Sequence, residues 1–410
     1  MRIGLIVDNE YNNDPRVSNE AKALHKAGFD VKILCFNYGS YKKKEFVEGV
    51  NVTRVRINKK LKNFLFGIMN SLPVYHYFWK NKIVRFIRKE KIDVIHVADL
   101  YMSRSGYLAK SKTGVILVVD LKENYPAAVV NYEWTKHFFK GLIAKPYKWK
   151  KLERSYLRYA DFIVTMCDVL KERLIERYSF LNAENIFIYM NVPDTDFLLS
   201  QPGNKNVIEK KGSFVVVYFG GVAIRRGIIT AIEAVCMLRM KKEDIKLLII
   251  GPVDNSEKDY FNTFFNNPVY NEILIYIPWI ELSELPSYLT KADVGISPII
   301  KSEQHETTIA NKMFQYSLFG KPIIVSDCEP QVRIVSTDGS GLIFRSEDAE
   351  DLASKILYLK NNPEIARQMG ENGKRAVLTK YNLNEGSKDL LFLYEKIFRS
   401  FGSLHCTPDN

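Results

Sequence analysis

Short apolar runs alternate with longer amphipathic stretches along the whole chain of 410 residues. The short runs are rich in Val, Ile and Phe, a composition that predicts β-strands. In the first half the predicted strands are Ile3–Val7, Val31–Phe36, Val52–Ile57, Asp93–Val97, Val115–Val119, Phe162–Thr165 and Ile186–Tyr189. Helical spacing fills the intervals, for instance over Pro15–Ala27, Lys80–Glu90 and Tyr147–Tyr159. This alternation is typical of a doubly wound parallel sheet.

The same pattern begins again after a polar stretch, Ser200–Ser213, which is the best candidate for a linker. The strands predicted beyond it are Phe214–Phe219, Lys246–Ile250, Ile273–Ile277, Val294–Ser297, Pro322–Val325 and Leu342–Phe344, with helices around Arg226–Met240, Leu282–Thr290 and Asn311–Phe319. Three further helices are predicted over Ala349–Ser400. We therefore expect two Rossmann-like α/β domains, residues 1–195 and 196–380. Residues 381–410 are expected to form a helix that packs back on the first domain, followed by a frayed tail.

The composition is that of an ordinary globular protein, with 46% apolar and 26% charged residues. It excludes a small disulfide scaffold, a disordered tail and an acidic calcium binder. The net charge of +12 is uneven, because residues 1–200 hold 34 basic and 21 acidic side chains whereas residues 201–410 hold 25 and 26. Such a basic half attracts polyanions or anionic lipid, although solubility alone is another explanation.

The five cysteines are scattered and have no zinc or disulfide spacing: Cys35, Cys167, Cys236, Cys328 and Cys406. We therefore expect no metal site. Met1–Ile6 leads directly into a strand without the pattern of a secretory signal, which favours the cytoplasm. The longest uncharged run, Asn63–Trp79, is short and interrupted by polar residues, so it does not predict a membrane-spanning helix.

The turn after the first strand of the second half contains Gly220–Gly221 followed by Arg225–Arg226. Paired glycines allow a ligand close to the backbone, and arginine matches phosphate oxygens in a bidentate geometry. The turn therefore predicts a diphosphate site, and a tight turn with two solvated arginines is the alternative.

The first turn of the chain, Asp8–Arg16, contains no glycine. A dehydrogenase that binds a dinucleotide would have Gly-x-Gly-x-x-Gly here, so that class is disfavoured.

Asp14 and Pro15 are explained by a helix N-cap and a first helical position. Arg16 is a candidate acceptor ligand. His96 and Asp99 end or follow a predicted strand and are candidates of the same kind, with a purely structural His96 as the alternative.

In its second half the chain contains a further series of ordered motifs, namely Gly220–Gly221, Arg226–Gly227, Leu248–Pro252, Ala292–Pro298 and Asn311–Ile324. The first half contributes Asp14–Val17, Asp93–His96, Asp120–Pro126 and Asn191–Asp194. In this order and spacing the chain resembles family 4 of the retaining glycosyltransferases, and the resemblance covers nearly the whole chain. The family has the GT-B fold, two Rossmann-like domains that face a central cleft.

The resemblance implies a nucleotide-sugar donor, linked to UDP or GDP, on the second domain and an acceptor on the first. Arg225 and Arg226 would hold the diphosphate, with no metal or other cofactor required. The other implied donor ligands are Gly220, Gly221, Gly251, Ser297, Asn311, Lys312 and Gln315. Lys122 and Glu123 occupy the place where relatives often have His followed by an acid, so they are implied catalytic residues.

The chain departs from the family pattern at two places. The usual pair of glutamates is replaced by Thr307 and Gln315, which removes charge from the donor site. Lys122 is a poor general base because its reference pKa is high. Retaining transfer in this family is thought to need no enzymic nucleophile, and the leaving diphosphate itself can accept the proton of the acceptor. Lys122 would then add positive charge near the sugar or the acceptor, or it would simply be solvated.

Cationic and aromatic residues interleave over Trp134–Arg158, and Lys59–Lys89 adds a second basic segment around the apolar Phe64–Met69. Such segments suit an anionic membrane surface, with an ordinary core helix as the alternative. Nucleic acid is disfavoured because no recognised binding motif is present.

The leading prediction is a transferase for capsule, lipopolysaccharide or exopolysaccharide. The alternatives are an inactive homologue that binds a partner and a GT-B nucleotide-sugar epimerase.

Overall fold

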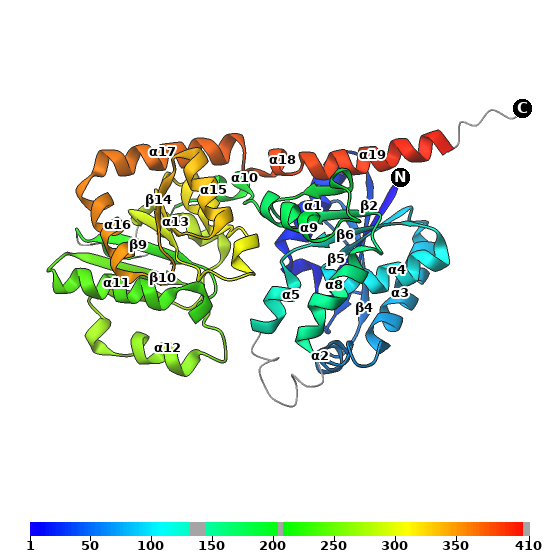
Figure 1. Cartoon of the computed structure of the whole chain (residues 1–410), viewed down its shortest axis with the longest axis horizontal. Helices are drawn as coiled ribbons and strands as arrows, with labels where there is room; N and C mark the ends of the chain where they lie inside the picture. Colours follow the sequence, from blue (N-terminus) through cyan, green and yellow to red (C-terminus); the bar gives the residue numbers. More distant parts are fainter. Residues whose placement is uncertain (132–144, 204–207, 211, 405–410) are drawn as a thin grey trace, which may run out of the picture. The chain divides into compact units, whose positions relative to one another are not determined.

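The structure is a computed structural model that describes residues 1–131, 145–203, 208–210 and 212–404 (Figure 1). The chain forms two compact units, Met1–Met190 with Gly386–Asn410, and Asn191–Glu385. It leaves the first unit after Met190 and returns after Glu385, a few residues from the bounds expected from the sequence.

The first unit contains an eight-stranded sheet with the order β3-β4-β2-β1-β5-β6-β7-β8. All pairs are parallel except β3 with β4. The strands are β1 Arg2–Ile6, β2 Asp30–Asn37, β3 Lys44–Val47, β4 Val50–Arg56, β5 Val94–Ala98, β6 Ile116–Leu121, β7 Phe162–Thr165 and β8 Ile186–Ile188. The seven strands predicted in this half are confirmed. The edge strand β3 was not predicted, because the sequence KEFV is short and has charged residues in half its positions.

The helices of the first unit are α1 Pro15–Lys26, α2 Lys59–Gly67, α3 Val74–Glu90, α4 Ser103–Thr113, α5 Tyr125–Ala128, α8 Trp149–Leu157, α9 Asp168–Arg177 and α19 Lys388–Leu404. The Val17 N–H donates to Asp14 Oδ1 at 3.2 Å, which confirms the predicted N-cap of α1. The aromatic residues of 132–144 that favoured a membrane segment lie outside the described residues.

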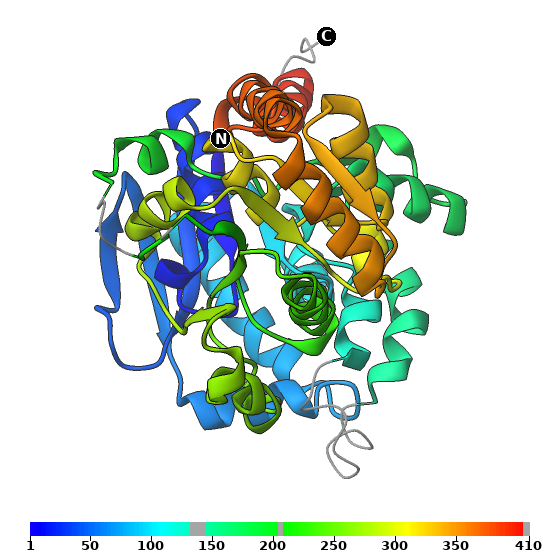
Figure 2. The same ribbon diagram turned by 90° about the vertical axis from the view of Figure 1, so that its left-hand side faces the viewer.

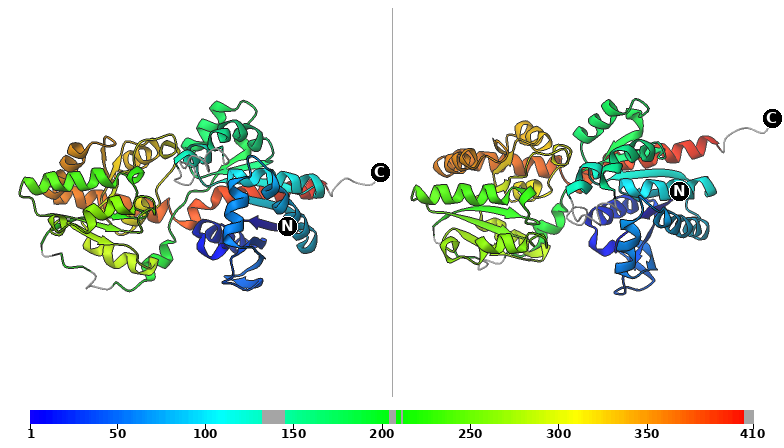
Figure 3. Two further views of the ribbon diagram at one scale, coloured as in Figure 1. Left: turned by 90° about the horizontal axis from the view of Figure 1, so that it is seen from below. Right: turned by 60° about the horizontal axis from the view of Figure 1, so that its bottom comes forward.

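Helices α1 and α19 bury their apolar residues against the same core as the strands. From α19 this core receives Leu390, Leu393, Tyr394 and Ile397. Figures 1 and 3 show α19, in red, running beside the elements of the first unit. The last helix is therefore an integral part of the first unit, although about 200 residues of the second unit separate it from β8 in sequence.

The second unit contains a parallel six-stranded sheet with the order β11-β10-β9-β12-β13-β14. Its strands are β9 Phe214–Phe219, β10 Ile245–Ile250, β11 Leu274–Ile277, β12 Val294–Ser297, β13 Ile323–Ser326 and β14 Gly341–Phe344. All six were predicted. The helices are α10 Thr195–Ser200, α11 Ile228–Met240, α12 Lys258–Phe265, α13 Leu285–Lys291, α14 Lys312–Leu318, α15 Glu329–Asp338, α16 Ala349–Asn361, α17 Pro363–Thr379 and α18 Leu383–Gly386.

Helix α11 packs on α16, and α14 packs on α17 (Figure 2). The main core of the unit joins apolar residues of the sheet to those of α11 and α16. Both sheets are thus doubly wound, and the carboxyl ends of their parallel strands are where ligands bind in such folds. No helix in the described ranges is long and apolar enough to cross a membrane.

Candidate active site

The glycine turn after β9 is shaped by close backbone approach. Gly220 has φ 127° and its N–H donates to the Ile250 carbonyl at 2.9 Å. Gly251, which follows β10, has φ 140°, and a Cβ there would lie 2.1 Å from the Gly220 carbonyl oxygen. A side chain at position 251 would therefore separate the two loops.

The loop after β12 joins the same place. A Cβ on Gly227, which has φ 71°, would lie 1.6 Å from the Pro298 carbonyl oxygen. The Ile300 N–H donates to the Arg225 carbonyl at 3.1 Å. Three loops that follow β9, β10 and β12 therefore meet at the carboxyl ends of the strands.

The two arginines of the turn lie in a short 3-10 helix, Ile224–Arg226. Arg225 forms an ion pair with Asp254, with Nη1 and Oδ2 3.2 Å apart. Arg226 is half-buried, and among the described residues no hydrogen bond or ion pair engages its guanidinium group. Arg226 is therefore the arginine that is available to an anionic ligand.

Lys312, the first residue of α14, is 7% exposed. Its Nζ atom lies 3.5 Å from the centroid of the Tyr218 ring and has no hydrogen-bond partner. A Cβ on Gly220 would lie 3.4 Å from this Nζ atom, so the amine sits directly beneath the glycine turn. Burial, with a smaller contribution from the charge of Arg226, lowers the pKa of Lys312 well below its ordinary value. An incoming anion would restore the charged form.

His305 is a site residue that the sequence analysis missed. It is 3% exposed, and its Nδ1 lies 2.7 Å from the Ile300 carbonyl oxygen. Because a carbonyl only accepts, Nδ1 carries the proton, and Nε2 is left with a lone pair and no partner. Burial, aided by the charge of Arg226, lowers the pKa of His305 to about 4. The sequence around His305 does not distinguish it from an ordinary core histidine.

Asn311 Oδ1 is a third buried atom without a hydrogen-bond partner. Within the described part of the second unit, the only such side-chain atoms are those of His305, Asn311 and Lys312. All three come from one segment, residues 305–312, and His305 and Lys312 both feel the charge of Arg226. Buried polar atoms are normally hydrogen-bonded, so this concentration marks a surface that a polar ligand completes.

Other predicted donor ligands are placed differently. The Ser297 hydroxyl is buried and donates to Gln331 Oε1 at 2.5 Å, so its side chain is used within the unit and is not offered to a ligand. Thr307 Oγ1 donates to the Gln304 carbonyl at 2.9 Å. The nearby Glu306 carboxylate accepts from the Glu329 N–H at the start of α15, at 3.2 Å. Gln315 is 6% exposed on α14.

In the first unit, Arg16 is engaged by Asp120. Arg16 Nε donates to Oδ2 at 2.9 Å and Nη2 donates to Oδ1 at 2.6 Å. The third nitrogen, Nη1, donates to the Tyr189 carbonyl at 2.7 Å, and Glu20 Oε1 lies 3.2 Å from Nε. Arg16 is buried, so its placement does not support the prediction that it contacts the acceptor.

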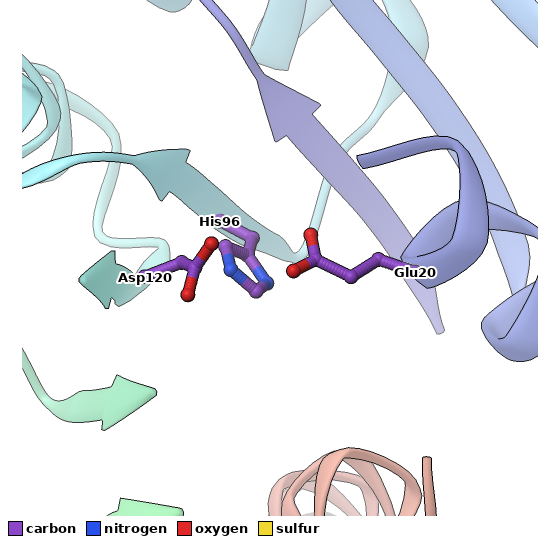
Figure 4. Close-up of side chains that lie close together, drawn as sticks. All are labelled: Glu20, His96 and Asp120. Carbon is purple, nitrogen blue, oxygen red and sulfur yellow. The ribbon is translucent and has the colours of Figure 1, made fainter. Parts of the chain in front are cut away.

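His96 belongs to the same buried cluster. Figure 4 shows Glu20, His96 and Asp120 close together, and their ligand atoms lie within 4.8 Å of one another. A metal ion could bridge such atoms, but the Arg16 guanidinium already pairs with Asp120, and burial raises the pKa of Glu20 well above its ordinary value, so only one of the two carboxyl groups requires a cation. His96 Nδ1 is 2.8 Å from the Tyr394 hydroxyl, and burial lowers its pKa to about 4. The structural alternative for His96 therefore fits better than acceptor binding.

Lys122 and Asp99 lie at the same edge of the sheet. Lys122 Nζ forms an ion pair with Asp14 Oδ2 at 2.6 Å. Burial opposes its charge, but the carboxylates of Asp99 and Asp14 outweigh burial and raise its pKa, so Lys122 is a fixed cation and not a base. Burial raises the pKa of Asp99 to about 8, although the charge of Lys122 opposes the shift. Asp99 can therefore exchange a proton near neutral pH.

Two family models match the chain side by side. The model described as Glycosyltransferase Family 4 matches residues 16–197, and the model described as Glycosyl transferases group 1 matches residues 201–376. The chain belongs to glycosyltransferase family 4. This confirms the resemblance seen in the sequence.

Relatives and solved structures agree with this assignment. The glycosyltransferase is 22% identical to an uncharacterized glycosyltransferase of Methanocaldococcus jannaschii, with 90% of each chain covered. It is 24% identical to the capsular polysaccharide biosynthesis glycosyltransferase CapM of Staphylococcus aureus, over 56% of this chain and 60% of that protein. The Anabaena protein Alr3699/HepE, solved in complex with UDP and glucose, matches with a TM-score of 0.68 at 14% identity, over 98% and 100% of the two chains. The predicted GT-B fold is confirmed.

Proposed function

We propose that this glycosyltransferase moves a sugar, with retention of anomeric configuration, from a nucleotide-sugar donor on the second unit to a saccharide or lipid-linked acceptor. The observation that carries the proposal is the set of three unpartnered buried atoms beside Arg226, on His305, Asn311 and Lys312. A nucleotide sugar offers both the negative phosphates that Lys312 can bind and the hydroxyl groups that His305 and Asn311 can bind.

The leaving diphosphate would be stabilised by positively charged side chains and not by a metal ion. Arg226 has no partner in the described chain, and Lys312 lies beneath the backbone of Gly220. Together with the N–H of the exposed Gly221, they would surround the phosphates on one side. Positive groups placed where charge develops are usually the largest contribution to catalysis of this kind.

The sugar hydroxyls would be bound by neutral acceptors. His305 Nε2 and Asn311 Oδ1 each have a free lone pair, and each can accept a hydrogen bond from a hydroxyl group. Gln315 would add an amide where relatives have a carboxylate. Neutral hydrogen bonds are about half as strong as charge-assisted ones, so we expect this enzyme to bind its sugar more weakly than a relative with the glutamate pair.

The acceptor would be bound by the first unit, near Asp99. The Asp99 carboxyl group is partly exposed and accepts a hydrogen bond from Tyr101 at 3.2 Å. With its raised pKa it can hold the acceptor hydroxyl while the leaving diphosphate takes the proton. The fixed charge of Lys122 would favour a polar or anionic acceptor.

The surroundings of α2 support attachment to the inner face of the cell membrane. No residue of α2 is buried, and Leu61 and Phe64 are 50% and 61% exposed beside Lys59 and Lys60. Exposed apolar residues flanked by lysines suit the boundary between headgroups and acyl chains. A cytoplasmic enzyme attached there would meet lipid-linked acceptors, as the similarity to a capsular polysaccharide transferase also favours.

One observation favours a second candidate, a homologue that binds a partner or a nucleotide sugar without turnover. The positions of the family's glutamate pair hold Thr307 and Gln315. The Thr307 hydroxyl donates to the backbone carbonyl of Gln304. On this alternative the donor would bind but no nucleotide would be released.

Release of UDP or GDP from a panel of nucleotide sugars, with saccharide and lipid-linked acceptors, tests the proposal. Wild-type protein should release nucleotide with at least one donor, whereas Arg226→Ala should lose about 100-fold or more in rate at saturating donor. Arg239→Ala, an exposed arginine of the same unit, is the control. Binding without turnover would favour the second candidate. A rate unaffected by Arg226→Ala would refute the proposed mechanism.

A further inference from the structure

A cavity of about 630 Å³ lies in the first unit between the strands β2 and β4 and the C-terminal half of α3. It shares no residue with the cluster around Asp99 and Lys122. Its size is that of a small-molecule site. Leu34, Val55 and Phe86 contribute apolar surface to it.

The lining is strongly cationic. Seven of the lining residues are basic and one is acidic: Lys43, Lys44, Arg54, Arg56, Lys82, Arg85 and Lys89, with Glu90. Of these seven cations, only Lys44, with Glu90, and Arg54, with Glu45, form an ion pair with a carboxylate among the described residues. The remaining five cations have no carboxylate partner among the described residues, so the cavity holds a large uncompensated positive charge.

Two of these cations repel each other. The side chains of Lys44 and Lys89 approach within hydrogen-bonding reach, and the proximity of Lys44 lowers the pKa of Lys89. Arg85 adds to the repulsion. The Glu90 carboxylate, which pairs with Lys44, offsets only part of this repulsion, because the pKa of Lys89 stays lowered.

One further group is fixed in advance. The Arg54 side chain is 0% exposed and lines the cavity. Its guanidinium group is held by an ion pair with Glu45, with Nη1 and Oε2 2.8 Å apart, and by a bond from Nη2 to Asn12 Oδ1 at 2.6 Å. Its Nε atom is buried without a partner. Because the side chain is buried, Arg54 adds a fixed positive charge to the wall of the cavity and does not itself contact a ligand.

We propose that this cavity is a binding site for a phosphate monoester or diphosphate, separate from the donor site. The phosphate lies among Lys44, Arg85 and Lys89, and the apolar residues contact the organic part of the ligand. The phosphate group belongs either to a membrane lipid headgroup or to a soluble phosphorylated compound. The proposal does not depend on the proposed transfer reaction.

The test uses full-length protein and two probes. Inorganic pyrophosphate represents a soluble ligand, and hydrogen exchange locates where it binds. Vesicles of phosphatidylcholine with a minority of phosphatidic acid represent a lipid, and flotation measures their binding. The double variant Arg85→Gln with Lys89→Gln removes two charges from the cavity. Lys80→Gln with Arg88→Gln removes two charges from the same helix at positions that do not line the cavity.

We expect at least one probe to bind and to slow amide exchange over Val50–Arg56 and Lys82–Glu90. The cavity variant should weaken that binding about tenfold or more, and the control variant should change it less than about twofold. Binding of pyrophosphate would indicate a soluble ligand, and binding of vesicles alone would indicate a lipid headgroup. Equal losses in the two variants, or slowed exchange confined to the second unit, would overturn the proposal, as would the failure of both probes to bind.

Discussion

The side-chain nitrogen of Lys312 lies 3.5 Å from the ring centroid of Tyr218 and has no hydrogen-bond partner. A buried lysine without a carboxylate carries a cost in stability, which a protein tolerates where the group serves a ligand. The same nitrogen lies beneath Gly220, at the carboxyl end of β9. Several expected outcomes depend on this arrangement.

Replacement of Lys312 by Met should weaken the binding of the donor nucleotide. Met keeps an unbranched apolar stem over Tyr218 but cannot bind phosphate. We expect a loss of about tenfold or more in affinity for UDP or GDP, measured by calorimetry. The unliganded variant should melt at the same temperature as the wild type or higher, because a buried amine has been removed. Lys321→Met is the control, and an equal loss in both variants would contradict the assignment.

Donor binding should be accompanied by the uptake of a proton. Burial lowers the pKa of Lys312 in the free protein, and a diphosphate beside it would raise that pKa. Between the two pKa values the complex binds more protons than the free enzyme, so the affinity should fall as the pH rises through that window. Titrations in buffers with different ionisation enthalpies measure the uptake. Lys312→Met should abolish it, and an undiminished uptake would assign the proton to another group.

Gly227→Ala should destabilise the second unit by about 2 kcal/mol or more and weaken donor binding. The new Cβ would lie 1.6 Å from the Pro298 carbonyl oxygen, at a φ of 71° that disfavours side chains. Thermal unfolding with and without nucleotide measures both effects. Gly203→Ala, where a Cβ meets nothing within 4 Å, should behave as the wild type.

Asp99→Asn should flatten the dependence of stability on pH. Because the pKa of Asp99 is raised to about 8 in the folded protein, the folded state binds more protons than the unfolded state from about pH 4 to pH 8. The wild type should therefore lose stability as the pH rises through that window. The variant should lose less, as followed by melting temperature against pH. An unchanged profile would show that Asp99 is ionised in the folded protein, and the exposed Asp30→Asn is the control.

Tyr394→Phe should lower the stability of the first unit by about 1–3 kcal/mol. The change removes the hydroxyl group that lies 2.8 Å from His96 Nδ1 and leaves a buried nitrogen unpaired. Chemical denaturation measures the loss. Tyr358→Phe, which changes an exposed side chain of α16, should have no comparable effect, and equal behaviour of the two would mean that the buried bond contributes nothing.

The strands could be predicted because each is a short apolar run, and the order of motifs was enough to predict the fold. The edge strand β3 could not be predicted, since it has only four residues, of which two are charged and none is fully buried. The pairing of Arg16 with Asp120 could not be predicted either, because 104 residues separate them and only the tertiary fold brings α1, which carries Arg16, to β6, which carries Asp120. His305 could not be predicted as a site residue, because what distinguishes it is an unpartnered Nε2 near the charges of Arg225 and Arg226, and that depends on the tertiary structure.

The packing of α19 on the first unit has a consequence for synthesis on the ribosome. The second unit is one continuous stretch, Asn191–Glu385, whereas the first unit is completed only by residues after Gly386. The second unit can therefore fold as soon as it has emerged, while the first waits with the apolar surface for Leu390, Leu393 and Ile397 uncovered. The protein is thus exposed to aggregation until its last helix leaves the ribosome, and a premature stop within α19 damages the unit that was made first.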